Sequence, residues 1–514
     1  MIVPSDLVLI LTALVVAGYI YSRQRSNRTG LPLPPGPKKW PIIGNLLQLP
    51  TSFEWETYAH WGEIYNSDIL HIDAAGTSII VVNSHKIAAD LFDKRSSLYS
   101  SRIQSVMLND LVGWNWLFGF MPYGEAWKER RRLFQHHFHP LDTTIHQQKE
   151  LEYTHKMLQR LLETPEHFMD HLRHMIGAIT INIGYGIDVQ PFNDPYIEIA
   201  EQALIGLAAG ANPGAFWVES FPFLKYVPSF LPGAGFKRKA AVWREWTRKM
   251  LEVPFAEAKR QIVEGSAMPS FTSMCLDNLD DKKDNSHQER VIKETAATFF
   301  VGGSDTTVSA MNTFMLAMVC YPEAQAKAQE EIDRVVGRSA LPDFTDEESL
   351  PYLSALIKEV LRWRTVTPLA IPHYLTEDDE YNGYHLPAGS IVVGNAWAIL
   401  HDKDDYPDPF NFRPERFLKD GKLNPEVRDP NAAFGFGRRV CPGKHIANST
   451  LWIAAACILS TFNISKALDE AGNPIEPSQE YHSSMVLHAL PFKCTIKPRS
   501  QRAEALIFAA GDPL

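Results

Sequence analysis

Cysteine is scarce in this 514-residue sequence. Its five cysteines, Cys275, Cys320, Cys441, Cys457 and Cys494, are widely spaced and odd in number, and no two of them form a CxxC pair. This pattern excludes a small disulfide-stabilised domain and gives no sign of a zinc site. A reduced, cytosol-facing protein fits this cysteine content best.

The sequence also lacks a basic excess, internal repeats and low-complexity segments. Its 50 lysines and arginines against 60 aspartates and glutamates give a formal net charge of -10, which argues against general affinity for nucleic acid. No linker rich in serine and glycine, or in charge, divides the chain after residue 40. We therefore predict one large domain over residues 41–500, followed by a C-terminal tail over residues 501–514.

One long hydrophobic run stands at the N-terminus. Residues 7–21 are nearly continuously apolar, and counted from Ile2 the run approaches the roughly 20 residues that span a bilayer as a helix. A cleaved signal peptide is the alternative, but no positive charge precedes the run and no small-residue cleavage site follows it. The arginines after the run place the large domain on the cytosolic side of the membrane. We predict a single transmembrane helix over residues 1–22 and a basic, proline-rich linker over residues 23–40.

Helical periodicity dominates the rest of the chain, and strand-like runs are few and short. The predicted fold is mainly α with small β-sheets. Pro254 is expected to kink or split the helix that contains it, and the polar stretch 265–287 is expected to be a loop. Helices are predicted over residues 125–137, 143–163, 170–187, 237–264, 288–320, 323–336, 352–362 and 444–461, and strands over residues 68–72 and 78–82 and near Ile391 and Lys493.

The strongest chemical motif is Phe434-Gly-Phe-Gly-Arg-Arg-Val-Cys-Pro-Gly443, which comes directly before a predicted helix. Glycines allow a backbone to approach a metal closely, and a helix N-terminus stabilises a thiolate. Arg439 can lie near an anionic group of a cofactor. A glycine-rich turn with an incidental buried cysteine is the alternative, although a turn alone would constrain these positions only loosely.

This motif resembles the signature Phe-x-x-Gly-x-Arg-x-Cys-x-Gly of the cytochrome P-450 superfamily, with Phe434, Gly437, Arg439, Cys441 and Gly443 at the matching positions. The resemblance implies the cytochrome P-450 fold and a heme b whose iron is bound by Cys441, with Phe434, Arg439 and Gly443 beside the cofactor. It also implies a monooxygenase that uses dioxygen and takes electrons from NADPH through a cytochrome P-450 reductase. Thiolate donation to iron favours cleavage of the O–O bond.

Two further motifs follow the order that the superfamily requires. Glu359-Val-Leu-Arg362 places an acid and a base three residues apart on one helix face, where they can pair. The motif Phe412-Arg-Pro-Glu-Arg-Phe417 lies downstream of it. The resemblance implies that Arg416 joins Glu359 and Arg362 in a buried network with a structural role.

Another helix, Trp127-Lys-Glu-Arg-Arg131, matches the superfamily's Trp-x-x-x-Arg pattern. The resemblance implies that Trp127 and Arg131 contact a heme propionate, the arginine through a charge-assisted hydrogen bond. His373 falls where the superfamily often has another propionate partner, with a purely structural histidine as the alternative. The basic cluster over residues 128–132 has two interpretations, a docking site for a reductase and a solvated helix face.

The long predicted helix contains two adjacent glycines, Gly302 and Gly303. Each is unfavourable in a helix by roughly 1 kcal/mol relative to alanine, which suggests a local opening of the helix. The resemblance places an oxygen-binding groove at this point and implies that Asp305 and Thr306 help to deliver protons to dioxygen. A hydroxyl next to a carboxylate suits such a relay.

Residues 103–123 are rich in Trp, Phe, Leu and Met. By resemblance they line the substrate pocket together with residues 366–371 and 483–487. A mostly apolar pocket predicts a lipophilic or aromatic small molecule as substrate. Asp110 or Glu219 could meet an amine, and a solvent-facing role is the alternative for each.

From about residue 31 to residue 498 the chain is similar to fungal secondary-metabolism members of the superfamily. This implies a role in secondary metabolism or xenobiotic oxidation at the endoplasmic reticulum membrane. The aromatic, proline-broken stretch 216–236 has three open interpretations: an access channel, a membrane contact, or packing on the core. A reductase-independent heme-thiolate isomerase and a non-catalytic heme sensor are the alternative functions. The pair Asp305-Thr306 disfavours the isomerase, and the pair together with a membrane anchor disfavours the sensor.

Overall fold

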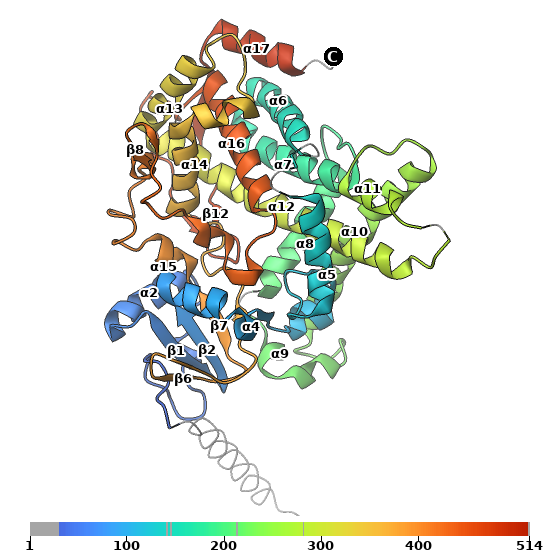
Figure 1. Ribbon diagram of the computed structural model, residues 1–514, viewed down its shortest axis with the longest axis vertical. Coiled ribbons are helices and arrows are strands. Elements are labelled where there is room, and N and C mark those ends of the chain that lie inside the picture. Colours follow the sequence, from blue (N-terminus) through green and yellow to red (C-terminus); the bar gives the residue numbers. More distant parts are fainter. Residues whose placement is uncertain (1–29, 140–141, 144–145, 212–213, 281, 512–514) are drawn as a thin grey trace, which may run out of the picture. The chain divides into compact units, whose positions relative to one another are not determined.

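A computed structural model describes residues 30–139, 142–143, 146–211, 214–280 and 282–511 (Figure 1). The described residues are mainly helical with small sheets, which confirms the predicted fold class. The chain divides into two compact units. The first holds the chain up to Ile103, Leu369–Ile399 and Phe436–Arg439, and the second holds Gln104–Pro368, Leu400–Gly435 and the chain from Val440 onward.

The N-terminal membrane segment is not tested by this structure. The predicted anchor over residues 1–22, and residues 23–29 of the predicted linker, lie outside the described residues. Within the part of the chain that is described, no helix combines the length and the apolar character needed to cross a bilayer.

The first unit is built on a five-stranded sheet in the order β1-β2-β7-β4-β3, in which β2 and β7 run parallel and the other neighbours run antiparallel. Tyr58 of α2 packs on this sheet in a core with Leu70, Ile72, Val81 and Val393. The strands are β1 (Ile69–Ala74), β2 (Thr77–Val82), β3 (Ser101–Arg102), β4 (His373–Tyr374) and β7 (Ile391–Gly394), with a separate pair β5 (Asp379–Tyr381) and β6 (Tyr384–Leu386). The helices are α2 (Glu54–Tyr65), α3 (His85–Ala88), η2 (Ala89–Lys94) and α4 (Ser96–Tyr99), and α15 (Ala396–Leu400) falls where the chain passes into the second unit.

The second unit is organised around α12 (Ser286–Cys320), most of whose side chains are buried. This helix packs against α5, α7, α10, α11, α14 and α16. The other helices are α5 (Glu125–His137), α6 (Gln147–Glu163), α7 (Phe168–Tyr185), α8 (Pro195–Ala211), α9 (Trp217–Ser220), α10 (Gly235–Val263), α11 (Phe271–Asp277), α13 (Pro322–Val335), α14 (Pro351–Trp363), α16 (Lys444–Thr461) and α17 (Gln501–Gly511). Short strand pairs are β8 (Leu418–Lys419) with β9 (Lys422–Leu423), β10 (Phe462–Lys466) with β13 (Cys494–Pro498), and β11 (Tyr481–His482) with β12 (His488–Ala489).

Two local features differ from expectation. The helix α10 is not split at Pro254 but runs through it, because the buried side chains of Met250, Pro254 and Ala258 pack the helix against its neighbours and offset the hydrogen bond that proline cannot make. The polar stretch 265–287 contains α11, whose first turn is capped by reciprocal hydrogen bonds between Ser270 and Ser273.

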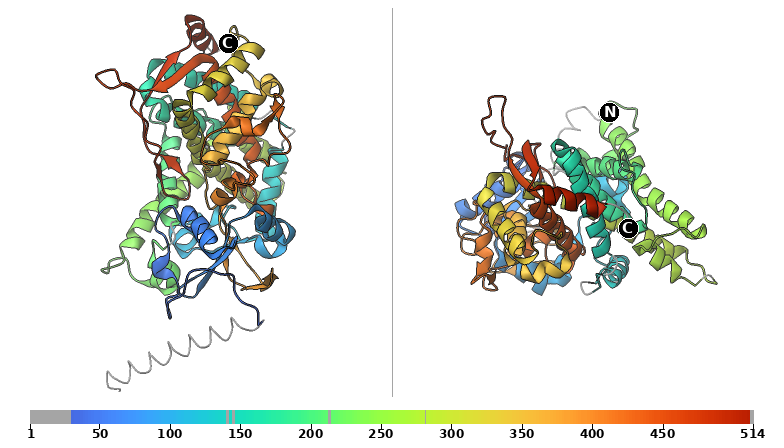
Figure 2. Two further views of the ribbon diagram at one scale, coloured as in Figure 1. Left: turned by 90° about the vertical axis from the view of Figure 1, so that its left-hand side faces the viewer. Right: turned by 90° about the horizontal axis from the view of Figure 1, so that it is seen from above.

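The stretch 501–514, expected as a C-terminal tail, contains a helix as far as it is described. This helix, α17, packs beside α6 and α16 (Figures 1 and 2). Its buried residues Ala503 and Ile507 lie four apart on one helix face, which accounts for the packing.

A buried carboxyl group joins α6 to α16. Glu150 of α6 has no exposed surface, and its Oε1 accepts hydrogen bonds from Ser449 Oγ at 2.8 Å and from Thr450 Oγ1 at 2.7 Å. Burial raises the pKa of Glu150 to about 8, although both hydroxyl groups lower it. The side chain therefore carries a proton at neutral pH.

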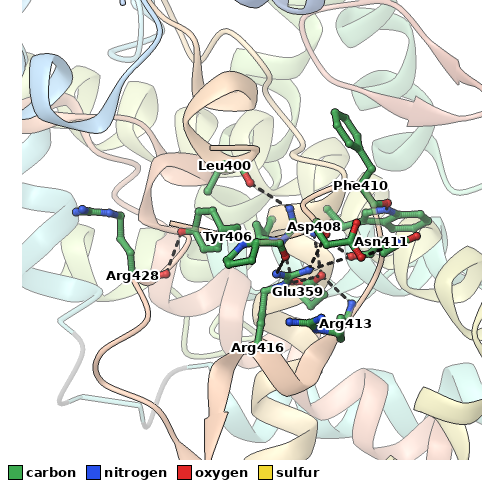
Figure 3. A network of polar contacts seen from close by, with 12 residues as sticks. Glu359, Leu400, Tyr406, Asp408, Phe410, Asn411, Arg413, Arg416 and Arg428 are labelled. Carbon is green, nitrogen blue, oxygen red and sulfur yellow. Dashed lines mark hydrogen bonds and ion pairs between the residues drawn. The ribbon is translucent and has the colours of Figure 1, made fainter. Parts of the chain in front are cut away.

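A second buried carboxyl group, that of Glu359 in α14, is ionised and lies between two guanidinium groups (Figure 3). Arg362 donates to its two oxygens at 2.7 and 2.8 Å. Arg416, in the short helix η8 (Pro414–Phe417), donates to the same oxygens at 3.1 Å. The structure thus brings together the three residues that the sequence assigned to one network.

The same two arginines fix the backbone of residues 400–411. Arg362 donates to the carbonyl of Leu400 at 3.1 Å, and Arg416 donates to the carbonyls of Pro407 at 2.7 Å and Asp408 at 3.1 Å. The network (Figure 3) therefore holds this irregular segment against α14 without regular secondary structure.

We predict that Glu359→Ala destabilises the protein by about 3–5 kcal/mol, because it leaves two buried positive charges facing each other. Thermal and urea unfolding would measure the loss. The matched control is Glu415→Gln in η8, which breaks an exposed pair with Lys327 and is expected to cost no more than about 1 kcal/mol. Equal losses in the two variants would contradict the prediction.

We also predict that stability depends on pH through Glu150. The folded protein keeps this proton up to about pH 8, whereas an unfolded glutamate loses it near its ordinary value of 4.5. The free energy of unfolding therefore falls as pH rises through this window, by up to about 1.4 kcal/mol per pH unit from this one group. Glu150→Gln should remove that part of the slope in unfolding measured from pH 5 to pH 8, and an unchanged slope would rule the effect out.

Candidate functional site

Cys441 lies in the loop that follows the short helices η9 (Asn431–Phe434) and η10 (Gly437–Arg439) and leads to α16. Its backbone N–H donates to the carbonyl of Phe434 at 2.8 Å, which closes the loop. Gly437 has a positive φ of 57°, and a Cβ there would lie 2.1 Å from the carbonyl oxygen of Phe92. Only glycine fits this position, which accounts for the glycine of the motif.

The surroundings of the Cys441 thiol are those of a metal ligand. Its side chain is accessible to solvent, yet the protein around it is dense enough that burial raises the pKa of the thiol. Three groups act in the opposite direction and favour the thiolate: the backbone N–H of Gly443, Arg131 and Lys444. A bound metal ion would lower the pKa further and complete the deprotonation.

Arg131 and Trp127 lie one turn apart in α5 and are both buried. Nη1 of Arg131 donates to the carbonyl of Val440 at 2.7 Å, directly before Cys441 in the chain. Arg131 therefore positions the cysteine loop as well as supplying positive charge near the thiol. The Trp127 ring lies 5.2 Å from the ring of Tyr123.

The paired glycines of α12 have two different surroundings. A Cβ at Gly303 would lie 2.4 Å from Cγ2 of Thr180 in α7, so Gly303 is required for close packing of the two helices. A Cβ at Gly302 would meet nothing within 4 Å, and Gly302 is exposed between the buried Val301 and the half-buried Gly303. The expected local opening of the helix is absent, because α12 is continuous here, but open space lies against it at Gly302.

Thr306 and Asp305 follow directly in α12. Oγ1 of Thr306 donates to the carbonyl of Gly302 at 2.6 Å, so this hydroxyl lies on the face of α12 that borders the open space. The carboxylate of Asp305 contacts Nε2 of His488 at 3.0 Å and Nη1 of Arg173 at 3.4 Å. Burial would raise the pKa of Asp305, but His488 and Arg173 outweigh it and hold the pKa below its usual value.

In the first unit, three buried basic side chains lie together: Arg102, His373 and Arg439. Burial and the charge of Arg439 lower the pKa of Arg102, whose Nη1 donates to the carbonyls of Ile371 at 2.6 Å and Pro372 at 3.1 Å. Buried guanidinium groups that lower one another's pKa in this way are stabilised by an anion beside them. The sequence analysis missed Arg102, since no motif marks it and only the pairing of β3 with β4 brings it to His373.

His373 is held as a neutral imidazole. Burial, Arg102 and Arg439 keep its pKa well below the usual value. Its Nδ1 lies 2.7 Å from the carbonyl of Tyr99, so Nδ1 carries the proton and Nε2 is an acceptor. In this form His373 holds β3 against β4, and its Nε2 cannot donate a hydrogen bond to a carboxylate. Direct contact with a heme propionate would require protonation of Nε2 as well.

The residues of the second unit fit heme b. They supply the thiol of Cys441, the positive charge of Arg131, and open space at Gly302 and Gly443, where an added Cβ would meet nothing within 4 Å. In the first unit, taken by itself, the guanidinium groups of Arg102 and Arg439 are of the kind that binds carboxylates such as heme propionates. Iron would be held by the thiolate, and bound heme would supply the activation of dioxygen.

The two acids considered for an amine substrate have protein partners instead. Oε1 of Glu219 accepts hydrogen bonds at 2.7 Å from Ser105 Oγ and from the backbone N–H of Met107. Oδ2 of Asp110 accepts from Nζ of Lys225 at 2.8 Å. These contacts tie the segment from Ser105 to Asp110 to the segment after α8.

Comparison with known proteins agrees with this site. The profile of the family described as Cytochrome P450 matches residues 34–496. Cytochrome P450 monooxygenase ple1 of Rhodocybe pseudopiperita is 47% identical over 93% of this chain and 91% of its own. Cytochrome P450 monooxygenase 98 of Postia placenta is 47% identical over 98% of this chain and 97% of its own, and tryptamine 4-monooxygenase of Psilocybe cyanescens is 45% identical over 96% and 98%. The chain therefore belongs to the cytochrome P450 family and is a monooxygenase.

Proposed function

We propose that this monooxygenase inserts one atom of dioxygen into a lipophilic or aromatic small molecule, with electrons supplied from NADPH by a separate cytochrome P450 reductase. The observation that carries the proposal is the pair Asp305–Thr306 in α12, with the Thr306 hydroxyl one turn from the open space at Gly302. A reductase-independent isomerase or a non-catalytic heme sensor would have no use for such a pair.

The chemistry that this chain adds to bound heme is control of protons and exclusion of water. The Thr306 hydroxyl can give up its bond to the Gly302 carbonyl and donate into the open space instead. The ionised carboxylate of Asp305 can then accept a proton from solvent-facing groups and pass it on. Neighbouring side chains of α12, such as Phe299 and Val301, are buried and apolar and keep bulk water away.

For the substrate, neither of the two acids considered for binding an amine is without a protein partner. Asp110 and Glu219 are already engaged by Lys225 and by the segment from Ser105 to Met107. An amine would therefore have to displace an existing partner. The similarity to a tryptamine 4-monooxygenase supports an aromatic ring as the oxidised group, in secondary metabolism or xenobiotic oxidation.

Reductase docking is proposed at the exposed part of α5. Of the four basic residues over 128–132, Arg130 is buried against Glu294 at 2.6 Å, and Arg131 is bonded to Val440. Lys128 and Arg132 remain at the surface and share Glu125. A reductase with an acidic surface would compete for these two side chains.

We place the enzyme at the endoplasmic reticulum membrane, held by the hydrophobic N-terminal run with the catalytic domain in the cytosol. A second membrane contact is proposed around η6 (Pro222–Tyr226), where aromatic side chains are exposed, with Tyr226 at 77% and Phe230 at 80%. Exposed aromatic side chains suit the interfacial region of a bilayer.

We predict that the reduced protein gives a strongly red-shifted Soret band with carbon monoxide, because a thiolate donates to the heme iron. Cys441→Ser should lose this band, since a hydroxyl does not replace the thiolate as an electron donor. Cys457→Ser, at a buried cysteine of α16, is the matched control and should keep it. A band typical of histidine-ligated heme in the unmodified protein would refute the assignment.

We predict that the full chain stays in the membrane fraction after extraction with alkaline carbonate. A variant without residues 2–22 should be released, because the remaining aromatic side chains bind only at the surface. Release of the full chain under these conditions would contradict the anchor.

A further inference from the structure

One face of α12 is bonded to the β11–β12 hairpin at three successive turns. Asp305 contacts His488, Ser309 donates to the carbonyl of Leu487, and the hydroxyl groups of Thr313 and Tyr481 lie 3.1 Å apart. Residues 305, 309 and 313 are spaced four apart and therefore share a face of the helix. The hairpin is thus held in a register that brings His488 to Asp305.

The charged groups around the Asp305 carboxylate come from three elements. His488 of β12 contacts one oxygen at 3.0 Å, and Arg173 of α7 contacts the other at 3.4 Å. Arg173 also reaches Glu201 of α8 at 3.6 Å. Burial raises the pKa of Glu201, the charge of Arg173 lowers it, and the nearby acids Asp170, Asp305 and Glu198 raise it. Arg173 thus lies between two carboxyl groups, those of Asp305 and Glu201.

Of the two donors to Asp305, only one can release a proton. An ionised carboxylate accepts hydrogen bonds, so Nε2 of His488 carries the hydrogen in this contact. A guanidinium group keeps its protons at any physiological pH, whereas an imidazole gains and loses one in the neutral range. The His488 side chain is 21% exposed, which gives it access to solvent protons.

We propose that His488 supplies protons to Asp305 and is the entry point of the proton path, with Arg173 only positioning the carboxylate. This role rests on the proposed monooxygenase function. In the step, the Nε2–H bond of the His488 imidazolium breaks and an O–H bond forms on Oδ2 of Asp305. The resulting neutral imidazole is protonated again from solvent water, so one proton enters for each proton passed on. His488 acts through Asp305 and is a positioning and proton-supplying residue.

The test uses two substitutions at one position. His488→Gln keeps a donor near Nε2 but cannot titrate, and His488→Ala removes both properties. His482→Gln is the matched control, since His482 is exposed and lies opposite His488 in the hairpin register. The carbon monoxide spectrum of each variant first establishes that heme is bound and the fold is intact.

The measurements are product formed per NADPH consumed from pH 5.5 to 8.5, and the rate in D₂O relative to H₂O, both in full-length enzyme with reductase. The probe is the indole or monocyclic aromatic that the unmodified enzyme oxidises fastest. We expect both His488 variants to lose about tenfold or more in coupled turnover. We also expect them to show a larger solvent isotope effect.

A readout independent of turnover is a double-mutant cycle of His488→Ala and Asp305→Asn on the thermal midpoint. Midpoint shifts that fail to add would establish the pairing in solution. Additive shifts would overturn the proposal, and so would full coupling with an unchanged solvent isotope effect in His488→Gln, which would reduce His488 to a hydrogen-bond donor. Absence of any NADPH- and dioxygen-dependent turnover in the unmodified enzyme would instead overturn the proposed function, and this role with it, whatever the outcome of the cycle.

Discussion

The carboxylate of Glu359, without contact with solvent, is the interaction on which the heme-side part of the second unit depends. Two guanidinium groups bind it, and their remaining N–H groups bind backbone carbonyls from Leu400 to Asn411. A buried ion pair of this kind adds little net stability over an apolar core, but it is costly to break once formed. The contribution of the Glu359 network is to fix the path of residues 400–411, which have few regular hydrogen bonds of their own. This segment precedes the loop that carries Cys441.

The helix α12 serves three purposes on three sides. At Gly303 it approaches α7 closely, and at Gly302 and Thr306 it borders open space. Along residues 305, 309 and 313 it holds the β11–β12 hairpin. A single rigid helix can therefore set the distance to a neighbouring helix, the room for a ligand and the position of a proton-carrying histidine. These contacts on three sides explain why polar residues occur in a helix that is otherwise mostly buried.

The sequence was informative where a local pattern carries the chemistry. The motif around Cys441, the acid–base spacing at Glu359 and Arg362, and most helices were predictable because each is encoded by neighbouring residues. Arg102, Glu150 and His488 were not, since each gains its role from partners far away in the chain: Arg439, Thr450 and Asp305. The helix α11 was missed because its turn is fixed by a serine capping box inside a polar stretch, and the unbroken α10 because packing outweighed the effect of Pro254.

The three bonds between α12 and the hairpin have a consequence for how such an enzyme can diversify. They involve Tyr481, Leu487 and His488, and none of them involves the turn residues 484–486 between the two strands. The turn can therefore change its side chains while the strand ends keep their register on α12. The resemblance to the superfamily implies that this turn faces the substrate pocket. Selection for a new substrate and selection for proton handling would then act on separate positions of the same short hairpin, which makes it a suitable target for randomisation in directed evolution.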